Sequence, residues 1–316
     1  MPNRHCPMIR LFGIVVLLSA AVPGWAAERY GDILVQLTGP GSGRSTFGYV
    51  DYRATVSNTG TVPHTVEIVM PHRGHSYGNH IRQISRTVTV PPASTATVSL
   101  LQPPLRMSGS GAGVVIDGRY QRQTLPLPSV NHAAAYYRGP QQYCILVSRQ
   151  IGYDDVNKGV ETLDTADLGG RRSFPSAGNQ DFNLALSERP VAEWSRNWLA
   201  YSRYGGVLLT GREWKTMPPE VKRALLEYVG CGGSLCVAGD AEWADPVHSF
   251  GSTPQDVFNT RYPGFGAVHL TDRGDVSLWT SSDWQILSST WAHSSRSLAN
   301  VKVSRRSEER RVGKAC

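Results

Sequence analysis

The spacing of apolar residues changes halfway along this 316-residue chain, and that change constrains the fold more than any single motif. Up to about Leu127, apolar and polar residues alternate in short runs that are separated by turn signals, which is typical of strands with one buried face. From Tyr143 onward, continuous apolar runs alternate with segments of helical spacing, which is typical of strands buried on both faces. The sequence therefore predicts two domains, the first all-β and the second α/β.

The first region, residues 28–127, is predicted to be a β-sandwich. The stretch "GYVDYRATVSNTGTVPHTVEIVMP" contains two alternating runs with a turn at Asn58-Thr59-Gly60. The stretch "RTVTVPPASTATVSLLQPP" repeats the arrangement around Pro91-Pro92, and a third hairpin is predicted to turn at Asp117-Gly118. This pattern resembles the immunoglobulin-like modules of bacterial secreted proteins, and the resemblance implies a spacer or an adhesive unit.

Residues 128–142 are predicted to be a linker, and residues 143–304 an α/β domain with a mostly parallel, doubly wound sheet. Five strands are expected, at residues 143–148, 182–188, 205–211, 234–240 and 266–272. One helix is expected within "RPVAEWSRNWLAY", residues 189–201. A second helix is expected to be capped by Thr216, to carry Pro218-Pro219 in its first turn and to stop at Gly230.

The segment "YSRYGGVLLTGREWKTMPPEVKRALLEYVGCGGSLCVAGD", Tyr201 to Asp240, resembles the class I glutamine amidotransferase-like superfamily. It is most similar to the degenerate, secreted or membrane-anchored members and to the trehalose-utilisation family, and the resemblance implies a flavodoxin-like sheet. Active members place a nucleophilic cysteine at a sharp strand-to-helix turn. Here that turn is expected at Gly239-Asp240, whereas Cys236 lies three residues earlier, inside the strand.

Cys236 is therefore predicted to be buried, protonated and inert, with a role in core packing. The family's triad also needs a His-x-Glu motif, and no histidine in the sequence is followed by a glutamate two residues later. Together these observations favour a non-catalytic protein with a binding or assembly role. No catalytic residue and no cofactor are predicted.

The alternative is a hydrolase or a metal-dependent enzyme that uses acidic residues at the carboxyl ends of the strands, where ligands of doubly wound sheets bind. Carboxylates gathered there could hold Mg²⁺ or Ca²⁺, or could act as acid and base. Ordinary solvated loops carry the same residue types, so both interpretations stay open. The candidates are Asp154, Asp155, Glu213, Asp240 and Glu242.

Three further groups of residues are candidates for sites. The histidines could bind a metal from a polar loop, although an exposed loop is the simpler interpretation. The tryptophans could line a carbohydrate site, although core packing is favoured because large aromatic side chains are mostly buried. The cysteines are predicted to be free thiols, two of them buried. The groups are His64, His72, His75 and His80; Trp279, Trp284 and Trp291; and Cys144, Cys231 and Cys236.

The two ends of the chain are set aside from the fold. Residues 1–26 have the layout of a signal peptide cleaved after Ala26, with an uncleaved anchor as the alternative. Residues 305–316 resemble the translation of a sequencing adapter, with a natural charged tail as the alternative. The formal charge of +7 falls to about +3 when +2 is subtracted for each end.

These features predict an exported protein that is periplasmic, or is anchored in the membrane through a missing C-terminal segment and faces the periplasm. Its expected partners are other envelope proteins or a small ligand. Nucleic acid is excluded as a partner, because binding to it requires basic residues clustered on one face and no basic run occurs between the two ends that are set aside.

Overall fold

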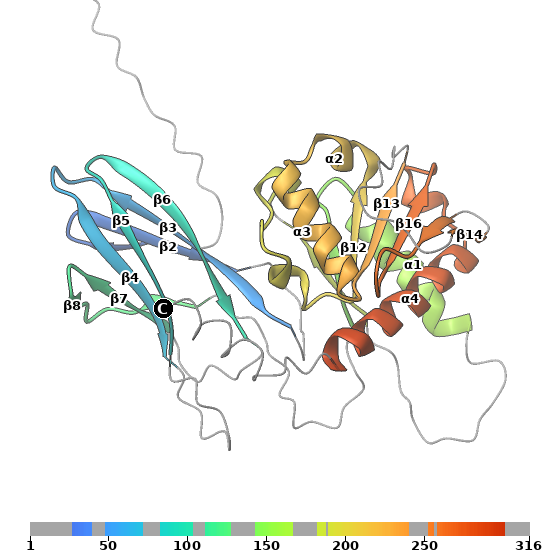
Figure 1. Ribbon diagram of the computed structural model, residues 1–316, viewed down its shortest axis with the longest axis horizontal. Helices are drawn as coiled ribbons and strands as arrows, with labels where there is room; N and C mark the ends of the chain where they lie inside the picture. The colour runs from blue at the N-terminus through green and yellow to red at the C-terminus, as the bar shows by residue number, and fades with distance from the viewer. Residues whose placement is uncertain are drawn as a thin grey trace, which may run out of the picture.

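The computed structural model describes residues 27–39, 48–71, 83–103, 111–127, 143–166, 182–187, 189–239, 252–255 and 258–300. Within these residues the chain forms three β-sheets and four α-helices. Figure 1 shows a β-rich half coloured blue to green and a half coloured green to red in which helices flank a sheet. The two halves coincide with the change in apolar spacing along the sequence.

The β half consists of two sheets that enclose one core. The first sheet has the order β1-β2-β3-β6, and the second has the order β5-β4-β7-β8 with β9 paired to β7. All of these pairings are antiparallel. The strands are β1 Glu28–Tyr30, β2 Ile33–Thr38, β3 Val50–Asn58, β4 His64–Pro71, β5 Gln83–Val90, β6 Ser94–Gln102, β7 Gly111–Ile116, β8 Arg119–Tyr120 and β9 Leu125–Pro126.

Alternate residues of both sheets fill this core. In β3, Tyr52, Ala54 and Val56 point inward, and in β4 Val66 and Ile68 meet them from the other sheet. The intervening residues of β3 point to the outer face, because successive side chains of a strand project to opposite sides. That outer face carries polar side chains, and it faces the second half of the molecule.

Two of the three predicted hairpins are wrong. β3 pairs with β2 and β6, and β4 pairs with β5 and β7, so the turn at Asn58-Thr59-Gly60 crosses between sheets. The connection at Pro91-Pro92 crosses likewise. Buried Asn58 holds both crossovers together, because its Nδ2 donates to the carbonyls of Val62 and Val90 at 2.7 and 3.1 Å.

The third hairpin is confirmed. Ile116 pairs with Arg119 across a two-residue turn. Asp117 and Gly118 both have positive φ, at 48° and 79°. This turn matches the right-handed twist of the flanking strands.

The second half is built on a seven-stranded sheet with the order β11-β10-β12-β13-β16-β15-β14. Its first five strands in that order are parallel, and they coincide with the five strands expected from the sequence. The two remaining strands are antiparallel and were not predicted. The strands are β10 Tyr143–Val147, β11 Phe182–Leu186, β12 Gly206–Thr210, β13 Ser234–Ala238, β14 Ser252–Gln255, β15 Phe258–Arg261 and β16 Ala267–Thr271.

Helices pack on both faces of this sheet (Figure 1). One face is covered by α3 Pro219–Gly230, together with Trp214 of α2 Gly211–Thr216. The opposite face is covered by α1 Tyr153–Ala166, by the 3-10 helix η4 Val276–Leu278 and by α4 Ser281–Asn300. Within the described residues, no helix is both long enough and apolar enough to cross a bilayer.

The expected helix at residues 189–201 is instead two short 3-10 helices, η2 Val191–Glu193 and η3 Trp198–Tyr201. Ser195 Oγ accepts from the backbone of Asn197, and Asn197 Oδ1 accepts from Leu199 N at 3.0 Å. These local bonds compete with a continuous helical ladder. On the apolar face of the expected helix, Val191, Trp194 and Tyr201 are buried and Trp198 is partly buried, but the spacing did not reveal this interruption.

The ends of α3 also differ from expectation. Pro218 is the N-cap of α3, whereas Thr216 closes the preceding α2 and donates to the carbonyl of Arg212. Gly230 is the last helical residue, and the positive φ expected there occurs at Gly232, at 109°. The helix itself is as predicted, and its buried residues are Val221, Ala224, Leu225, Tyr228 and Val229.

Candidate functional site

The predicted acidic candidates do not form one cluster in the described residues. Asp154 and Asp155 lie in the first turn of α1 rather than in a loop. Asp154 is exposed, and Asp155 folds back over Gly152, where a Cβ would collide with its carboxylate. Asp240 and Glu242 lie outside the described residues. No group of three His, Cys, Asp or Glu side chains that could hold a metal occurs in the described part of the chain.

The hydrogen bonds around Glu213 give its carboxylate a structural role. Its Oε2 accepts from Ser148 Oγ at 2.6 Å, from Thr210 N at 3.0 Å and from Thr210 Oγ1 at 3.0 Å. Thr210 Oγ1 in turn accepts from Glu213 N, which completes a capping box at the start of α2. The carboxylate is buried, and it ties the ends of β10 and β12 together.

Cys236 lies in the middle of β13 and is fully buried between the sheet and helices α1 and α4. Burial raises the pKa of its thiol well above the ordinary value, so the thiolate is disfavoured. The expected free thiols are confirmed for the described residues, with Cys144 and Cys236 buried and Cys231 partly exposed. Cys144 packs on the opposite face of the sheet, and β12 separates its strand from β13.

The turn that follows β13 presents a glycine. Gly239 has φ of +95°, and its N–H donates to the carbonyl of Thr271 at 2.9 Å. Gly239 borders a cavity of about 430 Å³ at the carboxyl end of the sheet, which the side chains of Arg212 and Lys215 also line. Of the turn expected at Gly239-Asp240, the structure describes only Gly239, which carries no side chain.

The remaining candidates have structural surroundings as well. Trp279, Trp284 and Trp291 are buried in one aromatic row under the sheet, so the core-packing interpretation is confirmed. His64 Nδ1 lies 2.7 Å from Asp117 Oδ2 at the surface of the β half. The other loop histidines, His72, His75 and His80, lie outside the described residues.

A larger concave surface lies where the two halves meet. The outer face of β3 and β6 packs there against the segment that contains η2 and η3. Tyr49 N donates to Ser202 Oγ at 2.9 Å, and Arg189 donates to Thr38 Oγ1. Gly48 is required at this contact, because a Cβ there would overlap the backbone of Arg203.

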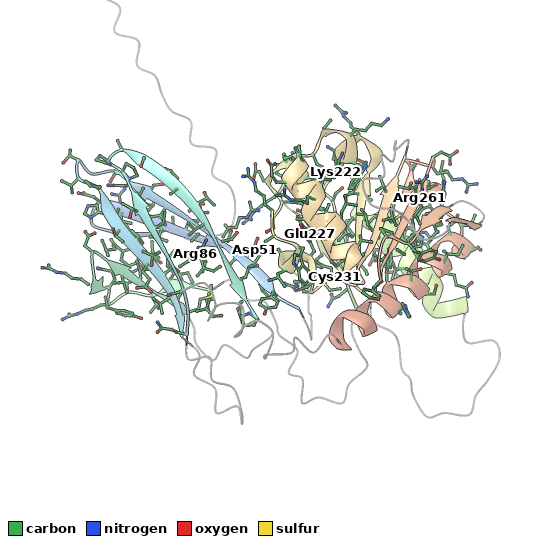
Figure 2. The ribbon with its side chains drawn as sticks, viewed as in Figure 1. Asp51, Arg86, Lys222, Glu227, Cys231 and Arg261 are labelled. Carbon is green, nitrogen blue, oxygen red and sulfur yellow. The ribbon has the colours of Figure 1, made fainter. Side chains whose placement is uncertain are left out.

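Asp51 is the most unusual residue of this contact. Strand alternation directs it to the outer face, yet it is only 7 % exposed because the second half covers it; Figure 2 shows it on the side of the β half that faces that half. Burial raises the pKa of its carboxyl group, and hydrogen bonds from Ser99 and Ser195 and the charges of Arg53 and Arg189 oppose the rise. The joint between the halves is thus made of polar and charged side chains.

Beside this joint runs a groove of about 1070 Å³. Arginines and hydroxyl groups dominate its lining. Arg86 and Arg196 are exposed, whereas Arg53 lies 3.8 Å from Asp51. The groove is lined by Thr38, Arg53, Thr55, residues 84–86, residues 97–101, Arg189 and residues 192–197.

The second half holds its side of the groove firmly. Trp194 donates its Nε1 to Ser187 Oγ at 2.9 Å, and Tyr201 donates its hydroxyl to the carbonyl of Ser195 at 2.6 Å. The ring of Tyr201 lies between those of Trp194 and Tyr228, at centroid distances of 6.2 and 6.1 Å. These contacts anchor residues 192–197 to the core beneath α3.

No pattern in the sequence predicted this groove. Arg53, Thr55 and Ser99 occupy the polar positions of alternating strands, which usually face solvent. Arg189 and Arg196 lie in a segment that was expected to be an ordinary amphipathic helix. Neither pattern indicates that the two surfaces meet.

Comparisons with known proteins do not assign the site. No protein-family model and no curated protein matches the sequence. Among solved structures, the β-glucosidase DesR from Streptomyces venezuelae, in complex with D-glucose, shares 10% identity over 28% of this chain and 14% of its own, with a TM-score of 0.17. A cycloisomaltooligosaccharide glucanotransferase from Paenibacillus sp., complexed with cycloisomaltoheptaose, shares 18% identity over 40% of this chain and 17% of its own, with a TM-score of 0.18. The chain spans less than a fifth of either neighbour, and similarity at this level implies neither a shared fold nor a shared activity.

Proposed function

We propose that this protein acts by binding or assembly rather than by catalysis, and that its α/β half is a degenerate relative of the amidotransferase-like domains. One observation carries the proposal: the turn after β13 presents Gly239, while the only cysteine of that strand is buried three residues earlier. In an active member, the nucleophile would project from such a turn toward its oxyanion hole. Here the described residue of that turn, Gly239, has no side chain.

The arrangement of strands supports the proposed fold classes. The parallel strands follow the spatial order β11-β10-β12-β13-β16, which corresponds to the 2-1-3-4-5 order of flavodoxin-like sheets. The two antiparallel sheets around one core are compatible with an immunoglobulin-like module in the first half. A fold of either kind supports many activities, so the function rests on the site rather than on the fold.

We infer that the binding surface is the groove between the halves. Ligand sites prefer domain interfaces, and a volume of about 1000 Å³ is at the upper end for a small-molecule pocket. The groove combines exposed arginines with hydroxyl groups, whereas the cavity beside Gly239 is less than half as large. This surface suits an envelope partner or an extended ligand.

Export to the envelope is part of the proposal, and the N-terminal sequence pattern supports it. After expression with its own leader, the protein should be recovered from the periplasmic fraction with Ala27 as its first residue. Intact-mass measurement of the purified protein tests this. A mass that includes residues 1–26 in a cytoplasmic fraction would remove the envelope from the proposal.

The absence of catalysis is tested with glutamine as substrate. Ammonia release by the wild-type protein should equal that of Cys236→Ser and of a buffer blank. Cys231→Ser is the matched control, because Cys231 is partly exposed and lies outside the strand. Ammonia release that Cys236→Ser abolishes and Cys231→Ser retains would overturn the proposal.

A further inference from the structure

Two open strand edges border the groove between the halves. β6 is an edge strand of the first sheet and β5 is an edge strand of the second, so each has one side without a pairing strand. They follow one another in the chain through Pro91-Pro92 and lie side by side. Within the described residues, no backbone hydrogen bond outside the ladders reaches β5 or β6 at residues 84–86 or 97–101.

The groove covers part of the outer face of β2 and β3, where Thr38, Arg53 and Thr55 line it, and it continues over the edges of β5 and β6. Consecutive residues of a strand point to opposite faces, so a pocket on a face is lined by every second residue. Here residues 84–86 of β5 and residues 97–101 of β6 line the groove without interruption. Only the edge of a strand offers consecutive residues to one ligand. The groove therefore exposes unpaired N–H and C=O groups.

The edge of β6 lacks the usual protection against pairing. Proteins block open edges with lysine, proline, bulges or short strands. β6 is nine residues long, "STATVSLLQ", and contains neither a charged residue nor a proline. Such an edge can accept an additional strand.

The charges around the edge select the chemistry of that strand. Four arginines line the groove against a single lining carboxylate, that of Glu193. Arg53 is shared with Asp51, but Arg86 and Arg196 are exposed and make no ion pair within the described residues. A second copy of this chain is a poor occupant, because β6 carries no acidic residue and would bring two sets of arginines together.

We propose that the groove binds an extended acidic peptide, which adds a strand to the open edge of β6 and places its carboxylates near Arg86 and Arg196. Main-chain pairing would supply affinity, and the arginines would supply selectivity. The five groove-lining residues of β6 span about 17 Å, so the bound segment should be about five to six residues long. This inference rests on the proposed binding function and specifies its ligand.

Fluorescence anisotropy with defined peptides tests the inference. The probe is a fluorescein-labelled peptide of alternating Val and Glu, eight residues long by design and therefore longer than the about 17 Å of edge. The same peptide with Lys in place of Glu should bind at least about tenfold more weakly. A version N-methylated on every peptide nitrogen should also lose at least about tenfold, because neither of its edges can donate hydrogen bonds to β6.

Matched variants locate the site. The double variant Arg86→Glu and Arg196→Glu should weaken binding of the Val-Glu peptide by at least about tenfold. Arg119→Glu is the control. Arg119 is also exposed, but it lies on β8, at the edge of the second sheet that is opposite β5. Binding to this control should stay within about twofold of wild type.

Each contrary outcome has a defined meaning. If the N-methylated peptide binds as tightly as the unmodified peptide, charge attraction is the only remaining explanation, and strand addition is overturned. Tighter binding of an oligogalacturonate of equal charge, lost in the double variant, would assign the groove to an anionic polysaccharide and preserve the binding function. A self-associating wild type that does not take up the peptide would assign the edge to a second copy. No binding of any probe up to about 1 mM would overturn the inference, whereas glutamine hydrolysis that depends on Cys236 would overturn the proposed function itself.

Discussion

Replacement of Glu213 distinguishes a structural carboxylate from a catalytic one. In Glu213→Ala, Ser148 Oγ and Thr210 N lose the acceptor that lies 2.6 and 3.0 Å away. A lost N-cap interaction costs about 1 kcal/mol, and a buried donor without a partner costs about 1–3 kcal/mol. We expect the free energy of unfolding to fall by about 3 kcal/mol in total. Glu213→Gln keeps a carbonyl acceptor and should lose about 1 kcal/mol.

Tryptophan fluorescence during urea unfolding measures this effect in the correct half. Seven of the eight tryptophans lie between Trp194 and Trp291, and the eighth is Trp25, so the signal reports on the α/β half. With a urea dependence of about 2 kcal/mol per molar, the midpoint for Glu213→Ala should fall by about 1.5 M. Glu220→Ala is the control, because Glu220 is exposed in the first turn of α3 and its removal should change the midpoint little.

The result that refutes the structural role is specific. Residues at catalytic sites are often strained, and their replacement tends to stabilise a protein while it removes activity. An unchanged or raised midpoint in Glu213→Ala would show that the capping box does not hold β10, β12 and α2 together. The acidic rim would then return as a candidate catalytic site.

Three further predictions concern the α/β half. Cys231 should react with a thiol reagent in the native protein while Cys236 and Cys144 stay unlabelled, and Cys236→Ala should cost about 1 kcal/mol; rapid modification of Cys236, located by mass spectrometry, would contradict its core position. In Gly159→Ala the new Cβ would overlap the ring of Trp284, so stability should fall by about 1–3 kcal/mol, and an unchanged urea midpoint would exclude this close approach. Buried His269 has a pKa lowered to about 4 by burial, so only the unfolded state takes up its proton between about pH 6.5 and 4. Stability should therefore fall by about 2 kcal/mol from pH 7 to pH 5, and His269→Gln should flatten this dependence in urea titrations at the two pH values.

The strands of both halves could be predicted because the spacing of their apolar residues depends on which faces of the strand are buried. Residues 235–238 of β13 are all apolar because helices cover both faces of the sheet, and the runs of β3 and β6 alternate because only one face is in the core. The burial of Cys236 followed from the same reasoning, since its position within the strand could be counted from Gly239. The spacing of apolar residues indicates which residues of a strand are buried, and these predictions required no other information.

Pairing partners and long-range contacts could not be predicted from spacing. The alternation of β3 is the same whether its neighbour is β4 or β6, so the crossovers at Asn58 and at Pro91-Pro92 were taken for hairpins. The helical spacing from Val191 to Tyr201 concealed the hydrogen bonds of Ser195 and Asn197. Glu213 was assigned to the rim correctly, but its partners Ser148 and Thr210 come together only when β10 and β12 pair. The groove needs both halves, and neither half encodes it alone.

The polar joint at Asp51 has a mechanical consequence. When an apolar interface opens, it must expose hydrophobic surface to water, and that cost keeps the two bodies closed. The joint around Asp51, Arg53, Arg189 and Ser195 exposes mainly groups that water solvates well, so polar joints of this kind permit relative motion of the halves. Salt shortens the Debye length from about 30 Å at 0.01 M to about 8 Å at 0.15 M, and it weakens the charge–charge attraction at the exposed margin of the joint more than at buried Asp51. We therefore expect the angle between the halves, and with it the width of the groove beside β6, to respond to ionic strength.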